Sequence, residues 1–326
     1  MKLKLGATLA LGLAALATPG QADAQDVATV ASPVPANADV VFSIPVNRPA
    51  VGEFESTNLN GRQLTVDLAG GDSFDTDAFA GTHYVRVIDG PAGGLWATIA
   101  SNDGSSVTLT NDTRGNGVAG LLTGDETVRL YPHHTVDSAF PEEDLGLSYT
   151  DGTQILLFDN AATAQNIPFG GQAIVQYNLG GFFPGWSDGD QILPPDTGIG
   201  LRNNADHGLT LLFQGDRPDH PVGYLVPDNV NKDVVVSSGY PVNTQVRFSG
   251  FGGVDQRQIL TFDNNAGVQN LAFGSDTIVQ FNVGGFFPGW SDAGLTLPAG
   301  DGYALRQNGG PGGVIRTVPV YPIATD

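Results

Sequence analysis

The chain has 326 residues, a formal net charge of −20 at pH 7, 45 glycines, 21 prolines and no cysteine. Only 15% of the residues are charged and 40% are hydrophobic, which excludes a charge-rich disordered chain. The density of glycine and proline excludes a long coiled coil. The absence of cysteine excludes a disulfide framework, a zinc–thiolate site and a cysteine nucleophile.

Residues 1–24 have the three parts of a secretory signal peptide. Lys2 and Lys4 supply positive charge, residues 5–17 are apolar, and residues 22–24 read Ala-Asp-Ala, which fits a cleavage site. The apolar stretch is shorter than the ~20 residues that span a bilayer, which favours a signal peptide over a membrane anchor. We therefore expect a secreted protein, outside the cell or on its surface, with the periplasm as the alternative.

The predicted mature chain is strongly acidic and retains a single lysine, Lys232. A surface of this charge repels phosphate backbones and anionic lipids and attracts cations. We expect no nucleic-acid partner and no membrane insertion. Calcium is the candidate cation.

The first half of the mature chain reads as an extended segment followed by short strands. Residues 25–38 lack turn signals and periodicity, and we interpret them as an extended leader or linker. Residues 39–140 alternate between apolar and polar side chains in short runs separated by turn residues, as in a small antiparallel barrel or sandwich. The runs that carry this prediction are 83–88, 95–100, 106–110 and 126–131, with a hairpin turn at 102–104.

The second half contains an internal repeat. Residues 154–204 align without gaps on residues 258–308, with 30 identities in 51 positions, and both copies contain QIL-x-FDN and GGFFPGWSD. A solenoid consists of more repeats than two, and each of its repeats is shorter than the spacing of these copies, so a solenoid is excluded. We interpret them as two homologous β-modules, at 141–236 and 237–326. The predicted fold class is all-β: an N-terminal small antiparallel barrel or sandwich domain, then these two modules.

Several longer segments carry a family resemblance. In chain order they read VVFSIPVNRPAVGEF, HYVRVIDGPAGGLWATIASN, TGDETVRLYPHHTVDSAFP and VGYLVPDNVNKDVVVSSGYPVN. QILTFDN, W-x-D and LPAGDGYALR follow. On these segments the chain resembles a family of exported β-rich bacterial proteins from Verrucomicrobia and their relatives, and the resemblance covers nearly all of the mature chain. The resemblance implies export and a β-rich fold, and it carries no catalytic residue. The paired GGFFPGWSD segments depart from the family pattern.

The two GGFFPGWSD segments hold the candidate contact residues. Their aromatic rings could stack on sugar faces while the aspartates accept hydrogen bonds from hydroxyl groups. Two alternatives stay open: the rings fill a small β core between glycine and proline turns, or the loops form a subunit contact. The candidates are Phe182, Phe183, Trp186 and Asp188 in the first segment and Phe286, Phe287, Trp290 and Asp292 in the second.

Short Asp-rich segments are the candidate metal sites. Calcium takes six to eight oxygen ligands, which Asp- and Gly-rich loops can supply. Neither segment has the EF-hand spacing, and the alternative, which the spacing favours, is ordinary turns in an acidic protein. The candidate ligands are Asp72, Asp75 and Asp77 in one segment and Asp188 and Asp190 in the other.

No motif in the chain points to catalysis. There is no G-x-S-x-G segment, and the adjacent His133 and His134 would point to opposite faces of a strand. These observations favour an exported, non-enzymatic structural or adhesive protein of the cell surface or extracellular matrix, one that self-assembles and has no cofactor other than calcium. Its partners would be further copies or other cell-surface components. The alternative is a pair of carbohydrate-binding modules that hold a polysaccharide on the GGFFPGWSD loops.

Overall fold

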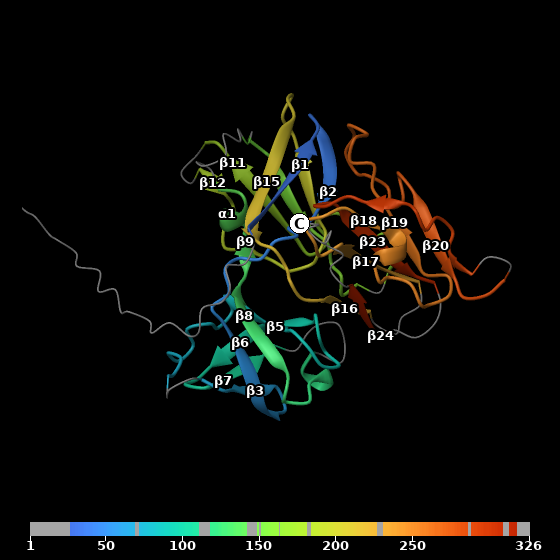
Figure 1. Cartoon of the computed structure of the whole chain (residues 1–326). Helices are drawn as coiled ribbons and strands as arrows, with labels where there is room; N and C mark the ends of the chain where they lie inside the picture. Colours follow the sequence, from blue (N-terminus) through green and yellow to red (C-terminus); the bar gives the residue numbers. More distant parts are fainter. Residues whose placement is uncertain are drawn as a thin grey trace, which may run out of the picture.

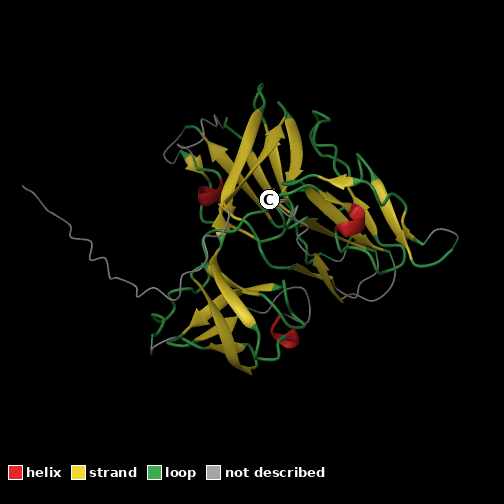
Figure 2. Ribbon diagram, viewed as in Figure 1, coloured by secondary structure: helices red, strands yellow, loops and turns green. Residues whose placement is uncertain are grey.

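The regular secondary structure of the described residues is almost entirely β-strand, as Figures 1 and 2 show for a computed structural model. The all-β prediction is confirmed. The residues that the structure describes are 27–68, 72–110, 118–141, 149, 151–162, 164–180, 184–226, 231–285, 288–308 and 313–317. Within them the helical elements are one turn each: α1 (Val136–Ala139) and the 3₁₀ turns Val118–Leu121 and Val246–Phe248.

A closed six-stranded antiparallel barrel occupies the lower part of Figure 1, with the strand order β3-β4-β7-β6-β5-β8. Alternating side chains such as Leu64, Ile99 and Leu130 are fully buried and fill its interior. The predicted turn at 102–104 joins β6 to β7, and the Asp103 carboxylate accepts a hydrogen bond from the backbone N–H of Ser106 at 3.0 Å. The strands are β3 (Gly52–Asn60), β4 (Gln63–Val66), β5 (His83–Val87), β6 (Trp96–Asn102), β7 (Ser106–Leu109) and β8 (Thr127–Pro132).

The first module is a β-sandwich at the upper left of Figure 1. One layer is a five-stranded antiparallel sheet with the order β12-β11-β10-β14-β2, and the strand pairs β1–β15 and β9–β13 face it. Buried side chains of both layers form one core, which includes Phe42, Leu201 and Phe213. Its strands are β1 (Val27–Val34), β2 (Ala38–Phe42), β9 (His134–Thr135), β10 (Gln154–Leu157), β11 (Ala173–Asn178), β12 (Gly185–Trp186), β13 (Ile192–Leu193), β14 (Ile199–Asn203) and β15 (Leu209–Asp216).

The second module repeats this arrangement at the right of Figure 1. Its five-stranded sheet has the order β21-β20-β19-β23-β17, with the pairs β16–β24 and β18–β22 beside it. The strand orders of the two sheets therefore correspond one to one. The strands are β16 (Val222–Val226), β17 (Lys232–Ser237), β18 (Thr244–Gln245), β19 (Gln258–Leu260), β20 (Ile278–Asn282), β21 (Gly289–Trp290), β22 (Thr296–Leu297), β23 (Gly302–Gln307) and β24 (Gly313–Thr317).

The barrel is inserted into the first module and does not precede it. Strand β2 pairs with β14 and β1 pairs with β15, so residues 27–42 complete the sandwich that continues after the barrel. In the second module the corresponding link from β17 to β18 is the short segment 238–243. The described part of the predicted leader, 25–38, is thus mostly strand β1.

The domain boundaries consequently differ from those predicted. The segment 39–140 includes strand β2, which belongs to the first module, and the segment 141–236 includes β17, which belongs to the second. Residues 237–326 lack that strand. The physical reason is that β2 and its partner β14 lie some 160 residues apart in the sequence. The alternation of side chains indicates that a segment is a strand, but it does not indicate which distant strand pairs with it.

Candidate functional site at the interface of the modules

The two modules pack together through equivalent residues. Phe158 and Phe262, from equivalent positions of the repeat, lie in one buried cluster with Val41 of β2 and Val235 of β17. Gly198 and Gly302 also face each other, because a Cβ added to Gly198 would lie 3.3 Å from the Cα of Gly302. A contact in which each side contributes the same residues is isologous, as in a two-fold dimer. The repeat therefore forms a pseudo-dimer within one chain.

Asparagines of the FDN segments tie each module to the other. The Asn160 side chain accepts a hydrogen bond from the backbone N–H of Val235 at 2.7 Å and donates one to its carbonyl at 2.9 Å. Asn264 makes the same two bonds with Val41, at 2.8 and 3.0 Å. Each amide therefore satisfies the backbone of the edge strand, β2 or β17, that the partner module presents, and it blocks that edge from pairing further.

A buried ion pair lies beside each of these contacts. The Asp39 side chain is 0% exposed and accepts hydrogen bonds from Nε and Nη2 of Arg202, both at 2.8 Å. It also accepts the backbone N–H of Asn270, which belongs to the other module, at 2.6 Å. These bonds raise the pKa of Arg202. The equivalent set in the second module is Asp233, Arg306 and Asn166.

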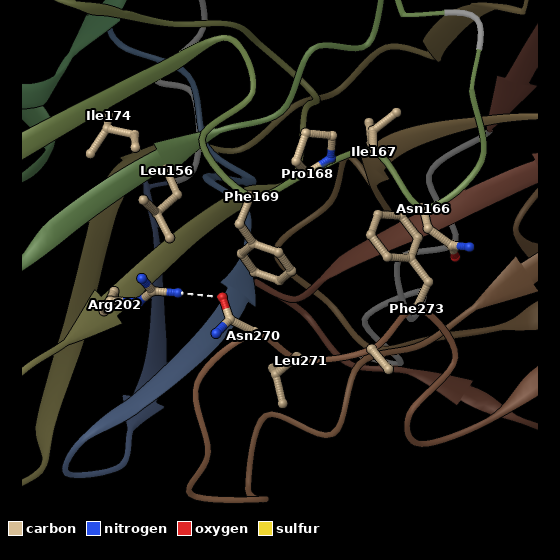
Figure 3. A pocket seen from close by; sticks show the side chains of 11 residues that line it. Leu156, Asn166, Ile167, Pro168, Phe169, Ile174, Arg202, Asn270, Leu271 and Phe273 are labelled. Atoms are coloured by element: carbon tan, nitrogen blue, oxygen red, sulfur yellow. Dashed lines mark hydrogen bonds between the residues drawn. The ribbon is translucent and has the colours of Figure 1, made fainter.

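A cavity of about 500 Å³ opens between the modules (Figure 3). Phe169 and Phe273, again from equivalent positions, form part of its wall, and Ile174, 55% exposed, lies at its rim. Arg202 and Asn270 line it and are joined by a hydrogen bond of 2.8 Å. The cavity therefore combines aromatic walls with amide and guanidinium groups.

The strands of the two GGFFPGWSD hairpins lie at the two outer ends of the module pair. Strands β2 and β17 meet the partner module, whereas β12 and β21 are the opposite edges of their sheets, and Figure 1 shows β11–β12 and β20 on opposite sides. Leu179 and Val283, at equivalent positions, are both 58% exposed. Their backbone N–H groups donate to Asp151 and Asp255 at 3.0 and 2.8 Å. The two ends thus share the same local structure.

The predicted tryptophans have structural partners. Trp186 is half-buried among aromatic rings, with its centroid 5.1 Å from that of Tyr177, and its indole N–H donates to the carbonyl of Phe140 at 3.2 Å. Trp290 is half-buried against Phe281, with centroids 5.3 Å apart. Both rings therefore contribute to the cores of their modules.

The predicted aspartates of these segments are exposed. The carboxylate of Asp292 accepts the backbone N–H groups of Gly294 and Leu295 at 3.0 and 3.1 Å, which closes a turn. Asp188 lies on the surface in the equivalent turn. The remaining candidates of the two segments, Phe182, Phe183, Phe286 and Phe287, lie outside the described residues.

The candidate calcium ligands lie in exposed turns. Asp72 and Asp75 are exposed, as is Asp190, and Asp77 uses its carboxylate to accept the backbone N–H of Asn102 at 3.3 Å. In the part of the chain that the structure describes, no three His, Cys, Asp or Glu side chains gather as a metal site would require. Calcium binding stays a prediction.

The barrel docks on both modules through a buried polar junction. Arg86 of β5 is buried and donates to Asp196 of the first module at 2.5 Å and to the carbonyl of Gly94 at 3.0 Å. That carbonyl also accepts the backbone N–H of Gly223 in β16 at 2.9 Å. Leu225 of the same strand joins the hydrophobic core of the barrel. The barrel is therefore held by charge, backbone and apolar contacts together.

We expect Gly94→Ala to weaken this docking. A Cβ at position 94 would lie 2.6 Å from the backbone N of Gly223, and Gly94 has a positive φ of 89°. Gly61 is the matched control, because its φ is 63° but no atom lies within 4 Å of its Cβ position. Urea unfolding should show a loss of about 3 kcal/mol for Gly94→Ala and about 1 kcal/mol for Gly61→Ala. Equal losses would contradict the close approach.

Three histidines lie in or beside this junction, of which His133 and His220 are buried and His134 is half-buried. His133 packs on Tyr84 with centroids 4.9 Å apart, and His220 packs on Tyr131 at 6.4 Å. His134 hydrogen-bonds to the carbonyl of Val46 at 3.2 Å. Burial lowers the pKa of His133 and of His134 to about 4 and that of His220 to about 3. All three side chains are therefore neutral at pH 7.

Sequence reasoning missed the residues that join the modules. A signal for the buried aspartates was present, because residues 38–43 read ADVVFS and residues 232–237 read KDVVVS. This pair is offset by 194 positions, whereas the main repeat is offset by 104, so the gap-free alignment stops short of it. The first offset is larger because the inserted barrel separates residues 38–43 from the rest of the first module.

Comparisons with known proteins place the chain in no family. No protein-family model matches it, and neither a curated protein nor a solved structure is significantly similar to it. Among the described residues, no helix has the length and apolar character needed to cross a membrane.

Proposed function

We propose that this chain is an exported, non-enzymatic structural protein of the cell surface or extracellular matrix that associates end to end. The proposal rests on one observation: both outer ends of the module pair carry the same hydrogen-bonded hairpin. Each hairpin presents an exposed aliphatic side chain, Leu179 at one end and Val283 at the other. A body with two equivalent ends can join two neighbours at once, and repetition of that contact builds a chain of subunits.

The interface between the modules supports the choice of the outer hairpins as the surfaces through which copies associate. Edge strands β2 and β17 are already occupied by the asparagine contacts, whereas the outer hairpins present equivalent surfaces at the opposite edges of the two sheets. The net charge of −20 makes copies repel each other. Calcium or another divalent cation would screen that repulsion and favour association. Partners are therefore further copies of the chain or acidic cell-surface components bridged by cations.

The test measures how many neighbouring copies one chain can bind. In sedimentation velocity with calcium, we expect the natural chain to form a series of oligomers. Leu179→Asp or Val283→Asp alone should stop growth at dimers, and the double variant should be monomeric, because each substitution places a charge at one end. Leu212→Asp is the control, since Leu212 is 38% exposed on β15, away from both hairpins. Oligomers that persist in the double variant would refute the proposal, as would a monomeric natural chain with and without calcium.

Carbohydrate binding on the GGFFPGWSD loops is the weaker proposal. Trp186 packs among Tyr177, Phe140 and Tyr149 and donates its N–H to the carbonyl of Phe140, so both its ring and its donor already have partners within the protein.

A further inference from the structure

We propose that the cavity between the two modules binds a neutral saccharide, with Phe169 and Phe273 against its C–H groups and the side-chain amides of Asn166 and Asn270 donating to its hydroxyl oxygens. This site is separate from the outer hairpins, and the inference goes beyond end-to-end association. The volume of about 500 Å³ falls within the range of small-molecule sites, and its position between two modules is a common one.

The amide groups have a fixed orientation. Asn270 Oδ1 accepts a hydrogen bond from Arg202, and Asn166 Oδ1 accepts one from Arg306, both at 2.8 Å. A guanidinium group can only donate, so each oxygen must face its arginine and each Nδ2 must point away from it. Neither Nδ2 has a hydrogen-bond partner among the described residues. Each Nδ2 is therefore a donor that can bind an acceptor from outside the chain, and both residues line the cavity.

The charge of the site favours a neutral ligand. The guanidinium of Arg202 is paired with the carboxylate of Asp39, which is 0% exposed, so the pair adds no net charge to the cavity. The whole chain carries −20, which opposes an anionic ligand. Among the described residues, no other ionisable side chain lines the cavity. Neither an anion nor a cation therefore finds an unpaired opposite charge there.

The walls are rigid and apolar. Phe169 packs against Phe158 with centroids 4.9 Å apart, and Phe273 packs against Phe262 at 5.1 Å, both edge to face. Ile174 extends this surface at the rim. A ligand that fits must present C–H groups to these walls and oxygen acceptors to the two amides. A pyranose ring has both on one small unit, whereas a hydrocarbon leaves the amide donors without acceptors.

Calorimetric titration of the mature chain tests the inference. The probes are neutral disaccharides and trisaccharides of glucose, mannose, xylose and N-acetylglucosamine, each used up to about 10 mM. The protein carries Leu179→Asp and Val283→Asp and is thus kept monomeric, which separates saccharide binding from association. We expect at least one probe to bind, and we expect its affinity to fall about tenfold in Asn270→Ala and in Ile174→Ser.

Two control variants leave the cavity intact. Ile278 is the equivalent of Ile174 in the second module, is 50% exposed and does not line the cavity. Asn265 is exposed in the segment before Asn270. Ile278→Ser and Asn265→Ala should bind as the parent does, and because both isoleucines are exposed, Ile174→Ser should fold normally. The inference is overturned if no probe binds, if the cavity variants bind as well as the controls, or if a galacturonate trisaccharide or a fatty acid binds while every neutral saccharide fails.

Discussion

Asp39→Ala should destabilise the protein by about 4 kcal/mol in urea unfolding, because it leaves the Arg202 guanidinium without its buried carboxylate and the backbone N–H of Asn270 without an acceptor. Truncation of one partner of a buried ion pair costs more than the pair itself contributes, since the remaining Arg202 charge, whose side chain is 21% exposed, loses its carboxylate and is only partly solvated. Asp206→Ala is the matched control. Its side chain is 97% exposed and its ion pair is with the half-exposed His207, so its loss should be within about 0.5 kcal/mol.

A second substitution separates the cost of the unpaired Arg202 charge from the cost of the hydrogen bonds that Asp39 no longer accepts. Asp39→Ala combined with Arg202→Met removes the unpaired charge and should recover part of the lost stability. If Asp39→Ala costs no more than Asp206→Ala, the contact between the modules does not depend on the buried pair. Asp233→Ala should behave as Asp39→Ala does, because the second module repeats the contact with Arg306 and Asn166.

The protein should lose stability as the pH falls from about 6.5 toward 4. Burial holds the pKa of His133, His134 and His220 at about 4, 4 and 3, below the value near 6.5 that histidine has in an unfolded chain. The unfolded state therefore binds protons in this pH range while the folded state does not. The stabilisation is fully present above pH 6.5 and is lost as the pH falls through the folded-state pKa values.

The charges around His220 act on its pKa in both directions. Arg86 and Arg129 lower its pKa and Asp219 raises it, but desolvation is the largest effect. We expect the melting temperature at pH 5 to lie roughly 10 °C below that at pH 7.5. His220→Gln should reduce this difference, because glutamine takes up no proton. His207→Gln should leave it unchanged, since His207 is half exposed. A melting temperature that is equal at both pH values would show that these rings are solvated.

The local β structure was predictable from the sequence. Period-two alternation and the turn at 102–104 identified strands β5 to β8, because a half-buried strand imposes that pattern on its own residues. The same holds for the repeat, because the aligned segments 154–204 and 258–308 contain the matching strands β10 and β11 in one copy and β19 and β20 in the other. Each of these elements is decided by residues close together in the chain.

The arrangement of the modules was not predictable in the same way. Strand β2 contains VVF, which reads as a buried strand, but its partner β14 lies beyond the whole barrel. The aspartate of that strand looks like any surface carboxylate until Arg202 and Asn270 are brought beside it from two modules. The cavity was likewise invisible, because Phe169 and Phe273 become its walls only when the modules meet.

Light scattering with negative-stain microscopy of residues 25–326, with calcium and with chelator, tests the central claim most directly. End-to-end association through Leu179 and Val283 predicts elongated particles whose mass grows with protein concentration, and growth that requires calcium would assign a role to the acidic surface. A single monomeric species in both conditions, at every concentration, would contradict the claim.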